Sequence, residues 1–310
     1  MRKPLGAALL ALALAVAGAG AAPAVAADVP SFGKGAGTGT ASLTSVVRDA
    51  VTSATQSLGQ ARRPAVQAVD LAGTVALSNC SGSVVRFADS EDNDPALVMS
   101  NGHCLETGMP APGEVVVDRA SSRTFGLLNA AGTRVGTLRA SKIAYGAMTD
   151  TDVSIYQLTT TYGQIRSSYG ISALTMSETR PAAGTAITVA SGYWKRLYSC
   201  NVDGFAYRLK EGGWTFKDSV RYTSACNTVG GTSGSPVVDQ ATKRVVAVNN
   251  TGNEDGQSCT LNNPCEVDQN GRITVRKGIN YAQQTYGIGA CFGVGNKLDL
   301  SASGCTLPRP

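Results

Sequence analysis

The chain has 310 residues, with 27 Lys and Arg, 22 Asp and Glu, and a formal net charge of +5. The basic residues are scattered, and so small a charge does not indicate a nucleic-acid partner or binding to a membrane surface. The 36 glycines, together with many Val, Thr and Ser residues, favour a β-rich fold with many tight turns.

The N-terminus has the pattern of a secretory signal peptide over residues 1–27. Arg2 and Lys3 precede an apolar stretch from Leu5 to Gly20, and small residues at 24–27 form a cleavage site. The alternative is an uncleaved membrane anchor. No later segment has 18 consecutive apolar residues, so we expect a secreted, extracellular protein without a membrane partner after signal removal.

Residues 28–70 contain no cysteine and differ in composition and apolar pattern from the rest of the chain. Residues 28–40 are Gly-rich, whereas apolar residues in 43–58 recur at helical spacing and predict one amphipathic helix. We interpret 28–70 as the pro-segment of a zymogen or as an N-terminal extension. The alternative is that this helix belongs to the mature domain.

From about residue 71 onward, short apolar runs of strand length alternate with turn residues. The predicted strands are 82–87, 96–99, 114–117, 134–138, 153–158, 185–189, 203–209, 214–221, 236–239, 245–248 and 272–276. Few long helical patterns intervene, so residues 71–310 predict an all-β domain of two packed barrels. The barrels would span about 71–170 and 180–290, followed by a disulfide-pinned tail over 287–310.

Eight cysteines follow the signal, which predicts four disulfides formed in an oxidising compartment. Their order along the chain suggests the pairs Cys80–Cys104, Cys200–Cys226, Cys259–Cys265 and Cys291–Cys305. No Cys-x-x-Cys pair exists and the chain has one histidine, so we expect no structural zinc and no cofactor. The acidic run 89–94 lacks the central glycine of an EF-hand loop and is interpreted as a solvated turn rather than a calcium site.

The single histidine, His103, lies in Asn-Gly-His-Cys, and far downstream the chain reads Gly-Gly-Thr-Ser-Gly-Ser-Pro over Gly230–Pro236. A serine hydroxyl needs a base with a pKa near the working pH to attack an amide, and histidine is such a base. The pattern predicts Ser233 as nucleophile and His103 as base. The glycine turn could direct the N–H groups of Gly231 and Ser233 at one oxyanion. The alternative is an ordinary Gly/Ser turn before a strand.

The base needs an acid that fixes its tautomer. Asp152 is the best candidate because it opens a predicted strand, where its carboxylate can be buried. Asp150 is the rival, and surface turn residues are the alternative for both.

These motifs resemble the triad motifs of chymotrypsin-fold serine proteases and follow in the same order, His, Asp, Ser. The Gly-Thr-Ser-Gly-Ser-Pro form is most similar to the bacterial glutamyl-endopeptidase and exfoliative-toxin branch. The resemblance spans roughly residues 80–252. It implies two antiparallel β-barrels with the site in the cleft between them, His103 and Asp152 in the first barrel and Ser233 in the second. It also implies that Cys80–Cys104 staples the loop under His103.

The chain departs from this family at two points. Animal digestive members carry an Asp before the serine that pairs with the new N-terminus, but Thr232 stands here. Glutamate-specific members use an additional histidine in the substrate pocket, and this chain has none. By position, the primary specificity pocket is lined by Asn227, Thr228, Asn249, Asn250 and Thr251. None is charged, so we expect a preference for uncharged side chains.

The sequence as a whole predicts a secreted, monomeric serine endopeptidase that acts on protein or peptide substrates. Two alternatives stay open. One is a catalytically inactive relative that serves as a peptide or surface binding module, and the other is an esterase with the same triad. With one imidazole in the chain, kcat/KM should rise with pH through a single group of pKa about 6.5–7.

Overall fold

The computed structural model describes residues 68–310. The predicted signal peptide, the Gly-rich segment and the predicted helix over 43–58 therefore lie outside the described residues. Within residues 68–310, no helix is both long enough and apolar enough to cross a membrane.

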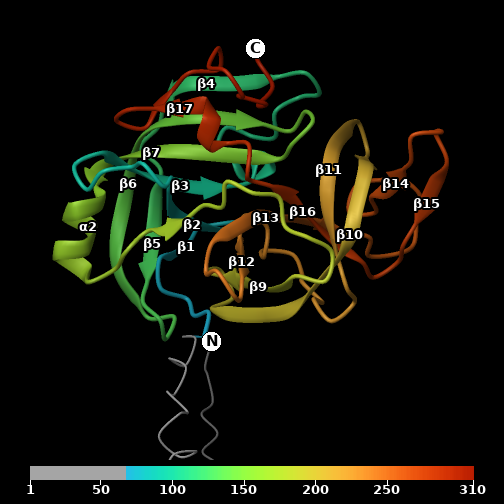
Figure 1. Cartoon of the computed structure of the whole chain (residues 1–310), viewed down its shortest axis with the longest axis horizontal. Coiled ribbons are helices and arrows are strands. Elements are labelled where there is room, and N and C mark those ends of the chain that lie inside the picture. The colour runs from blue at the N-terminus through green and yellow to red at the C-terminus, as the bar shows by residue number, and fades with distance from the viewer. Residues whose placement is uncertain (1–67) are drawn as a thin grey trace, which may run out of the picture. The chain divides into compact units, whose positions relative to one another are not determined.

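Two closed rings of antiparallel strands organise the described chain (Figure 1). In the first ring the order is β1-β5-β6-β7-β3-β2, and pairing of β1 with β2 closes it. Two further strands attach to it: β4 pairs with β6, and β8 runs parallel to β2. The bounds are β1 Thr74–Ala76, β2 Ser81–Arg86, β3 Pro95–Ser100, β4 Val115–Ala120, β5 Thr124–Leu128, β6 Arg134–Ala147, β7 Val153–Thr161 and β8 Leu174–Thr175.

The second ring has the order β11-β16-β13-β12-β9-β10, and pairing of β10 with β11 closes it. The strands β14 and β15 extend the sheet beyond β10, and β17 and β18 form a separate ribbon. The bounds are β9 Ala186–Ser191, β10 Arg196–Glu211, β11 Trp214–Tyr222, β12 Pro236–Asp239, β13 Val245–Gly252, β14 Cys265–Val267, β15 Ile273–Val275, β16 Asn280–Gln284, β17 Phe292–Gly293 and β18 Lys297–Leu298. The predicted all-β, two-barrel fold is confirmed.

Side-chain alternation along the strands explains why their apolar runs are continuous. In β2 and β3, Val84 and Val98 belong to the core inside the first ring, whereas their neighbours Val85 and Leu97 belong to a second core outside it. Both faces of these strands are therefore buried. Residues of the C-terminal stretch cover the outer face, and Phe292 packs against Phe87 with ring centroids 5.1 Å apart.

One α-helix, α2 (Tyr162–Tyr169), follows β7 and was not predicted from the sequence. The Thr161 side chain accepts from the Gln164 N–H and the Gln164 side chain accepts from the Thr161 N–H, a capping box. Gly170 ends the helix with φ 66°. At eight residues α2 is too short to produce a clear helical period in the sequence.

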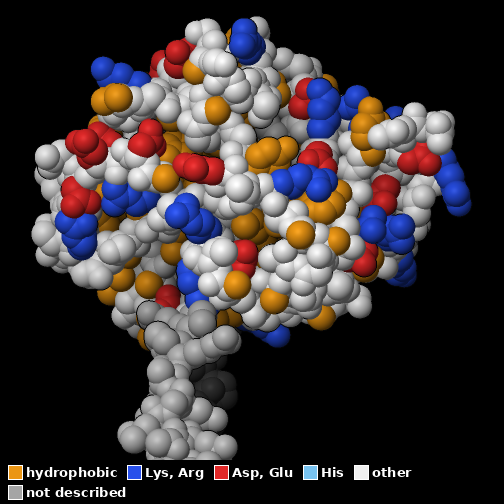
Figure 2. Space-filling model, in the orientation of Figure 1, with side chains coloured by type: hydrophobic (Ala, Val, Ile, Leu, Met, Phe, Trp, Pro, Cys, Tyr) orange, Lys and Arg blue, Asp and Glu red, His pale blue; other side chains and the backbone are white. Residues whose placement is uncertain are grey.

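Four disulfides join Cys80 to Cys104, Cys200 to Cys226, Cys259 to Cys265 and Cys291 to Cys305. These are the same pairs that the order of the cysteines suggests. Figure 2 shows charged side chains of both signs interspersed over one face of the molecule, without a broad patch of either sign.

Candidate active site

The short helix η1 (Gly102–Cys104) carries His103 directly after β3. The neighbouring strand β7 runs antiparallel to β3, with Ser154 opposite Ser100, so Asp152 lies next to η1. The His103 Nδ1 and the Asp152 Oδ2 are 2.6 Å apart, and the His103 backbone N–H donates to Asp152 Oδ1 at 3.0 Å. Asp152 is 1% exposed. Its carboxylate therefore fixes both the ring and the backbone of His103.

The residues before His103 bring it close to Asp152. The Asn101 side-chain amide donates to the Asp152 carbonyl at 2.8 Å, and the Ser154 hydroxyl donates to the Asn101 carbonyl at 2.8 Å. A Cβ atom at Gly102 would come within 2.2 Å of the Ala147 carbonyl oxygen. The sequence Asn-Gly-His thus has a local structural reason at each position.

The environment of His103 shifts its pKa in two opposing ways. Burial lowers the pKa, while the charge and hydrogen bond of Asp152, together with the charge of Glu211, raise it, and the net shift is upward. The adjacent carboxylate therefore makes His103 a stronger base than a free imidazole.

The rival acid, Asp150, lies elsewhere. Its side chain forms an ion pair with Lys217, and its backbone bridges to β11 through the Thr215 carbonyl and the Lys217 N–H. The structure therefore brings Asp152, and not Asp150, to His103.

Ser233 lies in the loop before β12, and its hydroxyl donates to the Asn250 carbonyl at 3.3 Å. It forms no hydrogen bond with His103 among the described residues, although both side chains line one cavity. The following Gly234 has φ 80°, and a Cβ there would lie 2.1 Å from the Ser81 carbonyl oxygen. The loop packs directly against the first ring, because the Ser81 N–H donates to the Ser233 carbonyl at 2.8 Å.

The N–H groups of Gly231 and Ser233 have no acceptor within residues 68–310. The Gly230 carbonyl, which shares a peptide unit with the Gly231 N–H, accepts from the Trp194 indole at 2.7 Å. Trp194 is absent from the cavity lining. Because C=O and N–H point in opposite directions in a trans peptide, this bond turns the Gly231 N–H away from Trp194. The two N–H groups are thus available to an oxyanion.

Thr232 is buried in a neutral hydrogen-bond network. Its hydroxyl donates to the Val229 carbonyl at 2.5 Å and accepts from the Asn249 amide at 3.1 Å. Asn249 in turn accepts from the Tyr222 hydroxyl at 3.2 Å. This network holds the residue before Ser233 without a charged partner.

The cavity has a volume of about 220 Å³ and is lined by His103, Asp152 and Ser233. All five residues predicted to contact substrate line it too: Asn227, Thr228, Asn249, Asn250 and Thr251. Two acids, Glu211 and Glu254, also line the cavity, and no Lys or Arg of the described chain does. None of the five predicted residues is charged, so the added acidic groups come from residues outside the motifs, such as Glu211 at the end of β10.

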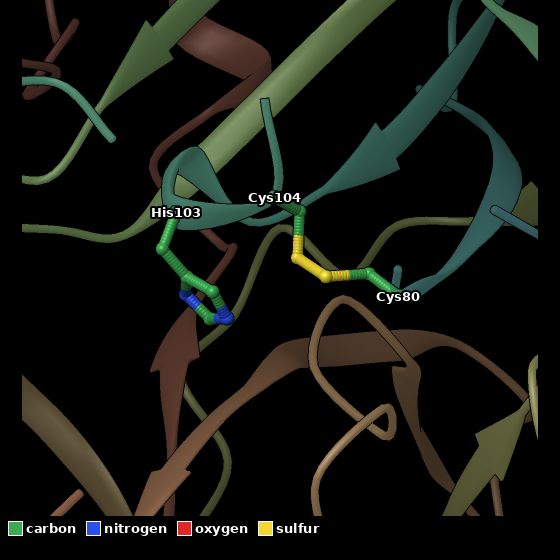
Figure 3. A group of neighbouring side chains, drawn as sticks. All are labelled: Cys80, His103 and Cys104. Atoms are coloured by element: carbon green, nitrogen blue, oxygen red, sulfur yellow. A yellow bond between two sulfur atoms is a disulfide. The ribbon is translucent and has the colours of Figure 1, made fainter. Parts of the chain in front are cut away.

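His103 also lies beside the Cys80–Cys104 disulfide, with donor atoms of the three residues within 4.8 Å of one another (Figure 3). Both side chains of η1 project to the same side (Figure 3). Zinc binds cysteine as thiolate, and these sulfurs are joined in a disulfide. The group does not fit a zinc site, and the disulfide instead anchors the turn that carries His103.

Comparison with known proteins gives one family match. Residues 80–248 match the model of the trypsin-like peptidase domain. No curated protein gives a significant match.

Solved structures of proteases are similar at low identity. The active form of the Rv3671c protease from M. tuberculosis is 13% identical, with 92% of this chain and 97% of that chain covered and a TM-score of 0.43. Protease Anisep from Arthrobacter nicotinovorans is 16% identical, with coverages of 70% and 90% and a TM-score of 0.41. The Nocardiopsis protease NAPase is 13% identical, with coverages of 70% and 93% and a TM-score of 0.39.

The family match covers more than half of the chain. It includes His103, Asp152 and Ser233 and parts of both strand rings. This chain belongs to the trypsin-like peptidase domain family.

Proposed function

We propose that this chain is a secreted serine endopeptidase that hydrolyses peptide bonds with Ser233 as nucleophile, His103 as base and Asp152 as orienting acid. The observation that carries the proposal is the shared cavity. It joins an imidazole bonded to a buried carboxylate, a serine hydroxyl, and a loop whose Gly231 and Ser233 N–H groups lack acceptors within the described chain.

The reaction starts when the Ser233 hydroxyl turns from the Asn250 carbonyl to His103 Nε2. His103 takes the proton as the oxygen attacks the carbonyl carbon of the substrate. The Gly231 and Ser233 N–H groups stabilise the oxyanion that forms. Protonated His103 then gives its proton to the leaving amine, which breaks the peptide bond and leaves an acyl-enzyme that water hydrolyses by the same steps.

Secretion and processing are part of the proposal. We infer a signal peptide over 1–27, a pro-segment or extension over 28–70 and a monomeric protease domain over 71–310. The four disulfides favour an oxidising, extracellular compartment. The neutral network of Thr232 favours an activation that needs no ion pair between a new N-terminus and this residue.

We use the resemblance to the glutamyl-endopeptidase branch only as a sign of relationship to that branch. A glutamate preference is not proposed, because His103 is the sole histidine and two acids besides Asp152 line the cavity. Beside Asn227 and Thr228 we expect an uncharged substrate side chain.

The test compares Ser233→Ala with Ser235→Ala on a peptide amide and a peptide ester. Ser235 is a matched control because it is buried and its hydroxyl has no hydrogen-bond partner. We expect Ser233→Ala to lower kcat on the order of 10⁵- to 10⁶-fold and Ser235→Ala to keep it within an order of magnitude.

Full activity of Ser233→Ala would overturn the assignment. Cleavage of esters without amides would indicate the esterase, and folded wild-type protein without any turnover would indicate the binding module.

A further inference from the structure

The carboxylate of Glu211 is an unusual group for the lining of this cavity. Glu211 ends β10 and is 6% exposed, yet it lines the same cavity as His103 and Ser233. Burial raises the pKa of Glu211, which means that the surroundings disfavour its charge. A buried carboxylate is costly unless a cation or several hydrogen bonds compensate it.

The described chain offers Glu211 little compensation. The Asn262 N–H donates to Oε1 at 2.8 Å and the Thr251 side chain also hydrogen-bonds to the carboxylate, but no Lys or Arg of residues 68–310 forms a salt bridge with it. A structural role toward Asn262 needs only an acceptor oxygen, which a neutral glutamine would supply equally well. Within the described chain, the positive charge that favours ionised Glu211 is that of protonated His103, which is already paired with Asp152.

The other acidic side chains at the cavity carry the same sign of charge as Glu211. Glu254 lies exposed on the rim, Asp152 lies behind His103, and the described lining contains no Lys or Arg. A substrate with an acidic side chain here would meet like charge, while a cationic side chain would supply the missing partner of Glu211.

We propose that Glu211 is a specificity residue that binds a lysine or arginine side chain of the substrate at one position beside the scissile bond. This inference rests on the proposed function. The uncharged part of the cavity beside Asn227 and Thr228 takes a different side chain of the same peptide.

The experiment is a position-scanning peptide library cleaved by the wild type and by Glu211→Gln, followed by kcat/KM for matched Lys and Gln peptides. The amide of Glu211→Gln keeps an acceptor for Asn262, so the loop should stay in place. We expect one position enriched in Lys or Arg in the wild type. The Lys-to-Gln ratio of kcat/KM should fall about 10- to 100-fold in Glu211→Gln, because a charged hydrogen bond is replaced by a neutral one.

Glu254→Gln is the matched control, since it removes an acid from the exposed rim of the same cavity. It should change the ratio less than threefold, as expected for an exposed charge. A wild-type profile without a cationic preference would overturn the inference, as would a preference that persists in Glu211→Gln. Absence of any wild-type cleavage would instead refute the proposed function. Circular dichroism and melting of each variant separate lost recognition from lost folding.

Discussion

The two rings contribute to the site in different ways. The first ring supplies His103 and Asp152, which lie on adjacent antiparallel elements and are already joined at 2.6 Å. The second ring supplies Ser233 on a loop, and its hydroxyl is bonded to Asn250 rather than to His103. Strand register thus places His103 and Asp152, which form the proton-transfer half of the site. Loop conformation places Ser233 and the Gly231 N–H, which form the nucleophilic half.

Several of the hydrogen bonds that hold the serine loop come from outside it. Ser81 of the first ring donates its N–H to the Ser233 carbonyl and its hydroxyl to the Gly231 carbonyl. The Trp194 indole donates to the Gly230 carbonyl. Substitutions in the proton-transfer half should therefore change proton transfer by His103. Substitutions around the loop should instead change the positions of Ser233 and the Gly231 N–H.

Among the variants that distinguish the two halves of the site, Asp152→Asn should have the largest effect, because it breaks the proton-transfer half. An amide would favour the wrong tautomer of His103, so kcat should fall about 10⁴-fold with the fold preserved. Steady-state kinetics on a peptide amide give the value. Asp150→Asn is the control, because its partner is Lys217 and the pair is partly exposed, so kcat should change little. Equal losses in the two variants would contradict the assignment.

Trp194→Phe tests the nucleophilic half. It keeps an aromatic ring but removes the donor to Gly230, so the Gly231 N–H is held less firmly toward the oxyanion. Removal of a direct oxyanion donor costs about 10²–10³-fold in kcat, and we expect an indirect loss of about 10-fold with KM nearly unchanged. The control is Tyr193→Phe, which leaves this hydrogen bond intact. A change confined to KM would place Trp194 in substrate binding instead.

The pH dependence of kcat/KM tests the proton-transfer half alone, because it reports the protonation state of His103. We propose neutral His103 as the base, and its pKa is raised, so kcat/KM should be lost below a midpoint that lies above the ordinary imidazole value and retained above it. Glu211 contributes to the rise, so Glu211→Gln should move the midpoint to lower pH. Measurement from pH 5 to 9 checks both, and a flat profile from pH 5 to 8 would refute the role of His103.

The smallest effect on activity is expected from the disulfides. Cys80–Cys104 closes a loop with a sequence separation of 24, and Cys291–Cys305 one of 14. Replacing either pair by alanine should lower the free energy of unfolding by about 3 kcal/mol, measured by denaturant titration. Only the first loss should also lower kcat severalfold in folded protein, because Cys104 adjoins His103. Equal activity of the two variants would show that the disulfide does not position the base.

The sequence motifs predicted much of this architecture. Each predicted strand range overlaps a strand of the structure, because alternating or continuous apolar runs mark them. Seven short strands were missed, since two to five residues carry too weak a period: β1, β5, β8, β14, β16, β17 and β18. The sequence allowed three catalytic residues to be proposed, because glycines and polar neighbours with local structural roles surround each of them: His103, Asp152 and Ser233.

Glu211 and Trp194 could not be found in the same way. Each stands at the end of a strand or in a turn, away from the motifs, and becomes relevant only through contacts across the fold: Glu211 with the cavity and Trp194 with Gly230. In the sequence, a single glutamate before two glycines is typical of the end of a hairpin. The sequence did not indicate that the Glu211 side chain is buried.

Activation of Ser233 by His103 can be measured as the rate of covalent labelling with a fluorophosphonate. We expect a single adduct that peptide mapping places on Ser233, and a labelling rate that falls by at least about 10³-fold in His103→Ala. An adduct on another residue, or equal rates in the wild type and His103→Ala, would contradict it.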